Sequence, residues 1–274
     1  MNNAPIGVFD SGIGGLTAVA EFNRLLPHEN IVYFGDTARL PYGTRSKETI
    51  LKYAEQDIRF IKKHNVKFIV AACGTVSSAV GANMNTGGGV PFTGVLMPAA
   101  QAACSATRSG KIGVIGTPAT IRSGAYGKAI RAIRPDLTVV GNGCPLFVPL
   151  VENGFTARDN EITKLAAAQY LKPIRDENVD VLIMGCTHYP IIRDIISDYM
   201  GENVTLISPG EEAAKHVLAV LTETEMLSDR EEQGENRYFA SDSVELFAEN
   251  AKAFLGQEFR GRVEKVIIHE LTAV

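Results

Sequence analysis

The fold of this chain is decided by two stretches of similar sequence, Phe68-Ile69-Val70-Ala71-Ala72-Cys73-Gly74-Thr75 and Val181-Leu182-Ile183-Met184-Gly185-Cys186-Thr187-His188. Each is an apolar run of strand length that ends in a cysteine, and the two cysteines stand 113 residues apart. The match extends upstream, because Asn65-Val66 before the first run lines up with Asn178-Val179 before the second. Two thiols in equivalent places indicate a duplicated unit that brings a pair of thiols to face each other.

Elsewhere, apolar runs alternate with amphipathic stretches of helix length, a pattern typical of parallel α/β folds. Residues 112–117 echo residues 6–11 at an offset of 106, and residues 139–142 echo residues 33–36 at the same offset. Three correspondences in the same order predict an internal duplication. The strands expected in the first unit are 6–9, 31–34 and 68–72, and its helices are 16–25, 47–64 and 77–84.

Two late strands are predicted at 237–240 and 263–268, on either side of a helix near 244–255. The first unit alone has few strands, so we expect these late strands to return and complete it. The predicted first domain is therefore 1–97 plus 209–274, and the second is 98–208.

The composition limits the kind of protein. The chain has 274 residues, of which 45% are hydrophobic and 21% charged, as in ordinary globular proteins. The net charge of −4 and the lack of a basic block give no sign of a nucleic-acid or membrane partner. No apolar run approaches the ~18 residues that span a bilayer, and no secretory signal is visible. We expect a cytoplasmic protein without metal, because disulfide and zinc patterns fit none of the four cysteines, Cys73, Cys104, Cys144 and Cys186.

Polar and nucleophilic side chains follow the predicted strands. The carboxyl ends of parallel strands lie along one edge of a sheet, and ligands bind in the crevice there. Facing units would bring Cys73 and Cys186 to opposite sides of such a cleft. The strand-end residues are Asp10, Ser11, Asp36, Thr37, Cys73, Thr117, Asn142, Cys186 and His188.

A facing thiol pair suits inversion at a carbon-bound hydrogen. One thiolate removes the proton from one face while a thiol delivers a proton to the other. A free thiol has a pKa of about 8.5, so the thiolate needs support from backbone N–H groups and a helix dipole after each cysteine. Asp10 or Asp36 would assist on one side, and His188 and Glu152 on the other. The alternative is core packing, which we expect for Cys104 and Cys144.

The glycine-rich stretch Asp10-Ser11-Gly12-Ile13-Gly14-Gly15 resembles a dinucleotide-binding turn only in part. The third glycine of G-x-G-x-x-G falls at Thr17, so that fingerprint fails, and the chain has no phosphate-binding G-K-[ST] loop. The amides of this turn can still form a nest for a substrate carboxylate.

Together these motifs resemble the glutamate racemases of the cofactor-independent aspartate/glutamate racemase family. The resemblance runs through most of the chain and rests on residues 7–16, 35–43, 117–120 with 123–126, 149–152 and 185–190. It implies two pseudo-symmetric, flavodoxin-like parallel-sheet domains of the α/β class, with the active site in the cleft between them. It also implies interconversion of L- and D-glutamate without a cofactor, supply of D-glutamate for peptidoglycan, and a homodimer.

By the same resemblance, Cys73 acts on the D-enantiomer and Cys186 on the L-enantiomer, while Asp10, Glu152 and His188 assist proton transfer. One departure stands at Gly74, where the family usually has asparagine. The residues implied to hold the substrate are Asp10, Ser11, Tyr42, Gly43, Gly74, Thr75, Thr117, Thr120, Thr187 and His188.

Two other interpretations remain open. One is a racemase of the same superfamily that acts on aspartate or another amino acid, although Pro41-Tyr42-Gly43 favours glutamate. The other is a non-catalytic α/β module that binds a nucleotide, a sugar or another small molecule, in which both cysteines are core residues.

Overall fold

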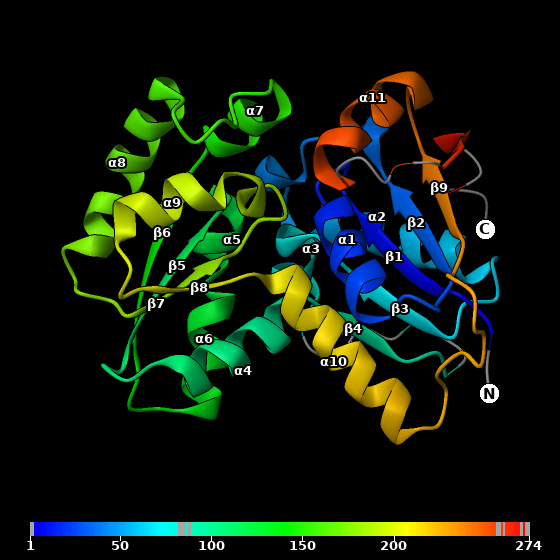
Figure 1. The fold of residues 1–274 in the computed structure, drawn as a ribbon, viewed down its shortest axis with the longest axis horizontal. Coiled ribbons are helices and arrows are strands. Elements are labelled where there is room, and N and C mark those ends of the chain that lie inside the picture. The colour runs from blue at the N-terminus through cyan, green and yellow to red at the C-terminus, as the bar shows by residue number, and fades with distance from the viewer. Residues whose placement is uncertain are drawn as a thin grey trace.

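Two parallel β-sheets form the framework of the protein, and Figure 1 shows them in two lobes that lie side by side. The computed structural model describes residues 3–81, 86, 89–255, 259, 261–268 and 271. The larger sheet has six strands in the order β10-β9-β2-β1-β3-β4, and the smaller has four in the order β6-β5-β7-β8. The α/β class predicted from the alternating pattern is confirmed.

The elements follow the predicted alternation of strands and helices. Up to β4 they are β1 (Ile6–Asp10), α1 (Leu16–Leu25), β2 (Ile31–Gly35), η1 (Thr37–Arg39), η2 (Tyr42–Thr44), α2 (Lys47–Lys62), β3 (Phe68–Ala71), α3 (Gly74–Val80) and β4 (Phe92–Gly94). From α4 to β8 they are α4 (Leu96–Ala106), β5 (Lys111–Gly116), α5 (Pro118–Ser123), α6 (Ala125–Ile133), β6 (Thr138–Gly143), α7 (Phe147–Glu152), α8 (Glu161–Arg175), β7 (Val181–Met184), η3 (Tyr189–Ile192), α9 (Arg193–Met200) and β8 (Thr205–Ile207). The last elements are α10 (Pro209–Glu223), β9 (Asn236–Ala240), α11 (Val244–Leu255) and β10 (Val263–Lys265).

One predicted helix is placed differently. The helix expected at 77–84 is α3, which begins at Gly74, directly after Cys73. The sequence pattern hid this start because no capping residue of the usual kind precedes it. Residues 82–85 lie outside the described part of the chain.

The two sheets contain the predicted repeat. The order β2-β1-β3-β4 in one sheet corresponds to β6-β5-β7-β8 in the other. Ile6 pairs with Phe68 in the first sheet, and Ile112 pairs with Val181 in the second, so the offsets of 106 and 113 both hold in the register. The second strand differs from expectation. Its offset is 108, because Ile6 pairs with Ile31 but Ile112 pairs with Val139.

The repeat includes an unusual backbone conformation. Asn65 and Asn178, which precede β3 and β7, have φ angles of 52° and 56°. Asparagine tolerates this left-handed region better than most residues and often ends a helix there. The Asn65 N–H donates to the Lys62 carbonyl at the end of α2, and the Asn178 N–H donates to the Arg175 carbonyl at the end of α8. The matching asparagines therefore reverse the chain from helix to cysteine-bearing strand in both lobes.

The central strands are buried on both faces by helices. Every residue of β1, β2, β3 and β7 is buried, which explains why these strands read as continuous apolar runs rather than alternating ones. Helices α1 and α11 lie on one face of the larger sheet, where their contact includes Phe22 and Phe247 in one apolar cluster. Ile50 and Ile61 of α2 belong to a second cluster with Ile69 of β3. Strand β6 is more exposed because it lies at an edge.

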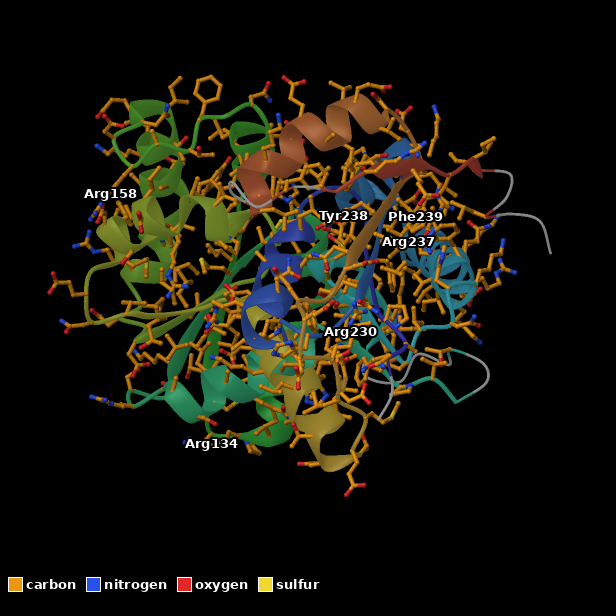
Figure 2. The ribbon with its side chains drawn as sticks, turned by 45° about the vertical axis from the view of Figure 1, so that its right-hand side comes forward. Arg134, Arg158, Arg230, Arg237, Tyr238 and Phe239 are labelled. Atoms are coloured by element: carbon orange, nitrogen blue, oxygen red, sulfur yellow. The ribbon has the colours of Figure 1, made fainter. Side chains whose placement is uncertain are left out.

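The late strands return to the first sheet as predicted. Strand β9 runs parallel to β2, with Tyr33 opposite Tyr238, and β10 extends the sheet beyond β9. On β9, the Arg237 guanidinium lies 5.1 Å from the centre of the Phe239 ring (Figure 2). The chain thus leaves the first lobe after β4, builds the second sheet, and comes back along α10.

Charged side chains at the periphery form exposed pairs. Arg134 and Arg158 lie at the margin of the second lobe (Figure 2) and pair with Asp136 and Asp198, each at 2.6 Å. Exposed pairs of this kind add little to stability. No helix in the described ranges has the length and apolar character to cross a membrane.

Candidate active site

A cleft of about 280 Å³ lies where the carboxyl ends of the two sheets meet. Both Cys73 and Cys186 line it, each placed two residues beyond the end of its strand, β3 or β7. Of the predicted site residues, eleven line the cleft: Ser11, Tyr42, Gly43, Cys73, Gly74, Thr75, Thr117, Glu152, Cys186, Thr187 and His188. Asp10 and Thr120 do not line it and lie one layer deeper, behind Ser11 and Thr117.

Cys73 is a buried thiol at the start of α3. Its Sγ donates to Ser11 Oγ at 3.6 Å, and both the N–H and the hydroxyl of Ser11 donate to Asp10 Oδ1, at 2.6 Å and 3.2 Å. Burial and then the negative charge of Asp10 raise the pKa of Cys73, although the Val76 N–H and Ser11 oppose this shift. The arrangement therefore holds a proton on Cys73.

Cys186 has a different partner. Its Sγ lies 3.9 Å from His188 Nδ1, and His188 Nε2 lies 2.9 Å from Glu152 Oε1. Burial lowers the pKa of His188, but the hydrogen bonds and charges of Cys186 and Glu152 outweigh it and raise the pKa to about 10. With both ring nitrogens protonated, His188 donates to Glu152 on one side and supports negative charge on Cys186 on the other.

The segments after the two cysteines also differ in backbone structure. Helix α3 follows Cys73 directly, whereas η3 starts only at Tyr189, three residues after Cys186. The expectation that a helix dipole supports both thiols is therefore wrong for Cys186. The imidazole of His188 occupies the corresponding role there.

Hydrogen bonds cross between the lobes on both sides of the thiols. Thr187 Oγ1 donates to Asp10 Oδ2 at 3.2 Å, and Thr17 Oγ1 donates to the Thr187 carbonyl at 2.8 Å. Thr75 Oγ1 lies 3.1 Å from Thr117 Oγ1. These contacts tie the β1 and β3 ends of one sheet to the β5 and β7 ends of the other.

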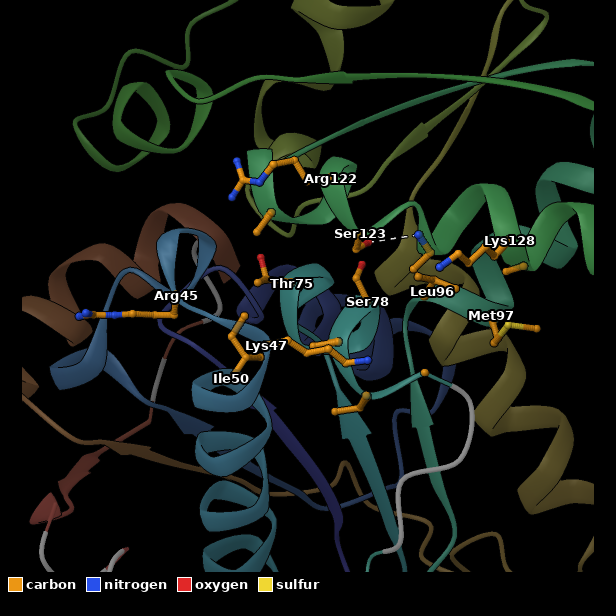
Figure 3. A pocket seen from close by; sticks show the side chains of 16 residues that line it. Arg45, Lys47, Ile50, Thr75, Ser78, Leu96, Met97, Arg122, Ser123 and Lys128 are labelled. Atoms are coloured by element: carbon orange, nitrogen blue, oxygen red, sulfur yellow. Dashed lines mark hydrogen bonds between the residues drawn. The ribbon is translucent and has the colours of Figure 1, made fainter.

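The Thr75–Thr117 contact separates the cleft from a second cavity. This cavity of about 530 Å³ also has Thr75 in its wall, and Figure 3 shows Ser78 and Ser123 there between Lys47 and Lys128. It contains neither cysteine. The cleft, although smaller, holds the nucleophilic groups, so it is the candidate active site.

Glycines allow the lobes to approach closely around Cys186. A Cβ on Gly74 would lie 2.3 Å from the Gly185 carbonyl oxygen, and a Cβ on Gly14 would lie 2.3 Å from Thr187 Oγ1 and 2.5 Å from His188 Nδ1. The segment 185–188 is thus held between two glycines of the other lobe. An asparagine side chain at position 74 has no room in this arrangement.

Tyr42 lines the cleft, as its predicted contact with substrate requires, whereas Asp36, the alternative to Asp10 beside Cys73, does not. The Tyr42 hydroxyl donates to the buried Asp36 Oδ2. Asp36 is buried against Arg39 and does not line the cleft. Asn142 likewise donates to the Tyr170 carbonyl. Asp10 is therefore the carboxylate beside Cys73.

Several apolar wall residues were missed by the sequence reasoning. Leu40 and Pro41 lie on one side, and Pro145, Val148 and Pro149 lie on the other. Such residues carry no chemical signature of their own, so only the folded structure identifies them. Cys144, expected in the core, is buried and also borders the cleft.

The cleft has no lysine or arginine in its described wall. The described residues contain no group of three or more His, Cys, Asp or Glu side chains that could bind a metal ion. The groups available to an anionic ligand are hydroxyls, backbone N–H groups and His188.

Comparison with known proteins agrees with this fold. The profile of the Asp/Glu/hydantoin racemase family matches residues 15–217. The glutamate racemase of Geobacter metallireducens is 45% identical over 251 residues, which cover 92% of each chain. The crystal structure of glutamate racemase isoform RacE1 from Bacillus anthracis superposes with a TM-score of 0.91 at 38% identity, covering 97% of this chain and 98% of that one. The Francisella tularensis glutamate racemase in complex with D-glutamate has a TM-score of 0.87 at 38% identity, with the same coverage.

The fold and the paired thiols define an α/β protein with a cleft suited to proton transfer. The family profile matches residues 15–217, and the relatives align over nearly the whole chain. The chain therefore belongs to the Asp/Glu/hydantoin racemase family, among the glutamate racemases.

Proposed function

We propose that this protein interconverts L- and D-glutamate by exchanging the α-proton between Cys73 and Cys186. The observation that carries this proposal is the placement of two buried cysteines, one from each sheet, in the wall of a single cleft. The relatives named above, which are glutamate racemases, support glutamate rather than aspartate as the substrate.

The reaction needs a base on one face of the α-carbon and an acid on the other. A thiolate takes the α-proton and becomes a thiol, and the opposite thiol gives its proton to the carbanion and becomes a thiolate. The product is the other enantiomer, and the two sulfurs have exchanged their protonation states. Reaction of the new enantiomer returns them, so no net proton is gained or lost.

The two thiols have different hydrogen-bond partners, which supports different roles for them in the proposed reaction. Cys73 lies beside the anionic Asp10–Ser11 pair and retains its proton, whereas Cys186 lies beside a protonated His188 that stabilises a thiolate. The resting protein is therefore ready to remove a proton from the Cys186 side. By its family resemblance, this side faces the α-proton of L-glutamate.

Hydroxyls and amides hold the substrate. Ser11, Thr75, Thr117 and Thr187 line the cleft, and the first N–H groups of α3 are donors that are not paired within the helix. These donors suit the carboxylates of glutamate. Gly43 and Gly74 let the two lobes approach closely at the cleft wall, and Thr120 supports Thr117 through its hydroxyl at 3.0 Å.

The broader expectations belong to the same proposal. Residues 1–97 plus 209–274 carry all six strands of the larger sheet, and residues 98–208 carry all four of the smaller, which supports a division into those two domains. The protein acts as a cytoplasmic homodimer and supplies D-glutamate for peptidoglycan. Sedimentation velocity measures its oligomeric state.

Circular dichroism of purified protein with L-glutamate tests the proposed function. The optical signal decays to zero without added cofactor and in the presence of a chelator. A parallel reaction with L-aspartate shows much slower decay. Decay of aspartate but not glutamate would assign the protein to another racemase of the superfamily, and tight binding of a nucleotide or sugar without any decay would favour a non-catalytic module.

A further inference from the structure

A cluster of buried charges lies behind the cleft wall at Tyr42, and the proton transfer described above does not use it. Asp36 and Asp57 are fully buried, and Arg39 is 8% exposed. Arg39 Nε donates to Asp36 Oδ2 at 2.5 Å, and Arg39 Nη2 donates to Asp57 Oδ1 at 2.8 Å. Two carboxyl groups thus share a single guanidinium in a site closed to water.

The Tyr42 hydroxyl links the two carboxyl groups. It lies in hydrogen-bond contact with Asp36 Oδ2 and at 3.3 Å from Asp57 Oδ2. A phenol has one proton to donate. If both carboxyl groups were ionised, one of these contacts would have no proton, and the cluster would retain a buried negative charge. Burial of an unbalanced charge is very costly.

The hydrogen bonds decide which carboxyl group carries the extra proton. Asp36 accepts from Arg39 and Tyr42 and also from Ser241 Oγ at 2.9 Å, so it has the partners of a carboxylate. Asp57 accepts from Arg39 through Oδ1, whereas its Oδ2 lies 3.3 Å from the Tyr42 hydroxyl, whose single proton goes to the nearer Asp36 Oδ2. A proton on Asp57 Oδ2 completes an ordered chain: Asp57 donates to the Tyr42 oxygen, and Tyr42 donates to Asp36.

The shift expected from the surroundings has the same direction. Burial and then the negative charge of Asp36 raise the pKa of Asp57 well above its ordinary value, against the opposing influence of Arg39 and of the Tyr42 hydroxyl.

The cluster joins distant segments to the cleft. Asp36 follows β2, Arg39 lies in η1, Asp57 lies on α2, and Ser241 follows β9. Ser241 Oγ also accepts from the Ala38 N–H at 3.0 Å. These contacts hold η2, which carries the cleft wall.

We propose that Asp57, held as a neutral acid, is a positioning residue that fixes the Tyr42–Thr44 wall of the cleft through Tyr42, Asp36 and Arg39. The wall matters because Gly43 packs against Thr117 of the other lobe, where an added Cβ would lie 3.4 Å from Thr117 Cβ. Displacement of η2 therefore alters the space in which the substrate binds. The effect on substrate binding rests on the proposed racemase function, whereas the protonation of Asp57 does not.

Substitutions of Asp57 and Asp36 distinguish a neutral carboxyl group from an ionised one. Asp57→Asn keeps a donor toward Tyr42 and an acceptor toward Arg39, so KM and kcat for glutamate remain within about twofold of the parent. Asp57→Ala removes both the donor toward Tyr42 and the acceptor toward Arg39. Asp36→Asn leaves Arg39 without its buried anion and raises KM at least about tenfold, given the usual strength of hydrogen bonds to charged groups. Rescue by Asn at 57 but not at 36 is the signature of one neutral and one ionised carboxyl group.

Infrared spectroscopy reads the proton directly, with no need for turnover. The spectrum of the parent minus that of Asp57→Asn at pH 7 shows the carbonyl band of a protonated carboxyl group. Absence of this band, or Asp57→Asn as damaging to KM as Asp36→Asn, would overturn the assignment. If Asp36→Asn does not fold, Tyr42→Phe provides the kinetic test, and unchanged KM in a folded Tyr42→Phe would overturn the positioning role. A band without any racemisation would leave Asp57 neutral but refute the proposed function.

Discussion

Gly74 at the start of α3 touches the carbonyl of Gly185 at the end of β7 so closely that a Cβ on Gly74 would lie 2.3 Å from that oxygen. Gly74 directly follows Cys73, and Gly185 directly precedes Cys186, the two candidate catalytic thiols. Their contact fixes how closely the two cysteine-bearing segments approach. The absence of a side chain at position 74 is therefore part of the geometry of the cleft.

A side chain at position 74 forces the lobes apart. We expect Gly74→Ala to lower kcat/KM at least about tenfold and to reduce the free energy of unfolding by about 1–3 kcal/mol, the usual cost of overpacking. Gly74→Asn has a larger effect of the same kind. Gly141→Ala is the matched control, because a Cβ there meets Ile121 at an ordinary 3.5 Å. Full activity in Gly74→Asn would show that the cleft opens freely and that the Gly74–Gly185 contact does not fix the distance between the two cysteine-bearing segments.

Thr117 and Thr120 are neighbouring hydroxyl residues with different roles, because Thr117 forms the cleft wall and Thr120 supports it. Thr117 lines the cleft, whereas Thr120 is buried behind it. We expect Thr117→Val to raise KM for glutamate about tenfold, through loss of a hydrogen bond to a charged ligand. Thr120→Val raises KM less. Steady-state kinetics of the two valine variants measures this difference, and a larger effect at Thr120 would reverse their assignment.

The stability contribution of His188 depends on pH. Its pKa is raised from 6.5 to about 10 in the folded protein, so the folded state binds the proton more tightly than the unfolded chain. The stabilisation is fully present below pH 6.5 and disappears as the pH rises through 10. We therefore expect the difference in unfolding free energy between the parent and His188→Asn to be largest below pH 6.5 and to shrink as the pH rises toward 10.

Urea unfolding at several pH values measures this difference. Glu152→Gln is the control, because it removes the charge but not the hydrogen-bonding group, and its effect shows a weaker dependence on pH. A His188→Asn difference that grows with rising pH would contradict the protonated state of His188.

The unequal neighbours of the thiols also predict a kinetic asymmetry. L- and D-glutamate have equal free energies, so the equilibrium constant is unity and kcat/KM must be equal in both directions for every variant. We expect His188→Asn to lower kcat/KM about 10²–10⁴-fold, the usual contribution of an acid–base group. We expect kcat to fall more for L-glutamate than for D-glutamate, because the reaction of L-glutamate starts from Cys186. Since kcat/KM stays equal in the two directions, the KM for L-glutamate then falls relative to the KM for D-glutamate by the same factor. Equal kcat values in the two directions would mean that His188 serves both thiols alike.

Much of this arrangement is predictable from sequence, for identifiable reasons. Continuous apolar runs before Cys73 and Cys186 predicted two buried parallel strands, and the matching Asn65 and Asn178 extended the repeat upstream of them. The repeat then placed both thiols at one cleft. The register of β6 was not predictable, because its two-residue shift arises in a connection whose sequence carries no repeat.

Other features depend on contacts between distant segments. No pattern shows that Asp36 turns from the cleft to Arg39, or that α2 brings Asp57 to the same place. The Gly74–Gly185 approach is equally invisible, because a glycine after a strand fits many loops. The apolar wall at Val148 has no motif at all.

Hydrogen exchange at the α-carbon tests the two-thiol reaction most directly. L-glutamate is converted in deuterium oxide, and deuterium at the α-carbon is measured by mass spectrometry in both enantiomers at early times. Transfer between two faces predicts that the D-glutamate formed carries solvent deuterium from Cys73, while the remaining L-glutamate carries almost none. D-glutamate that retains the original α-hydrogen, or deuterium that appears equally in both enantiomers from the start, would contradict proton transfer between Cys186 and Cys73.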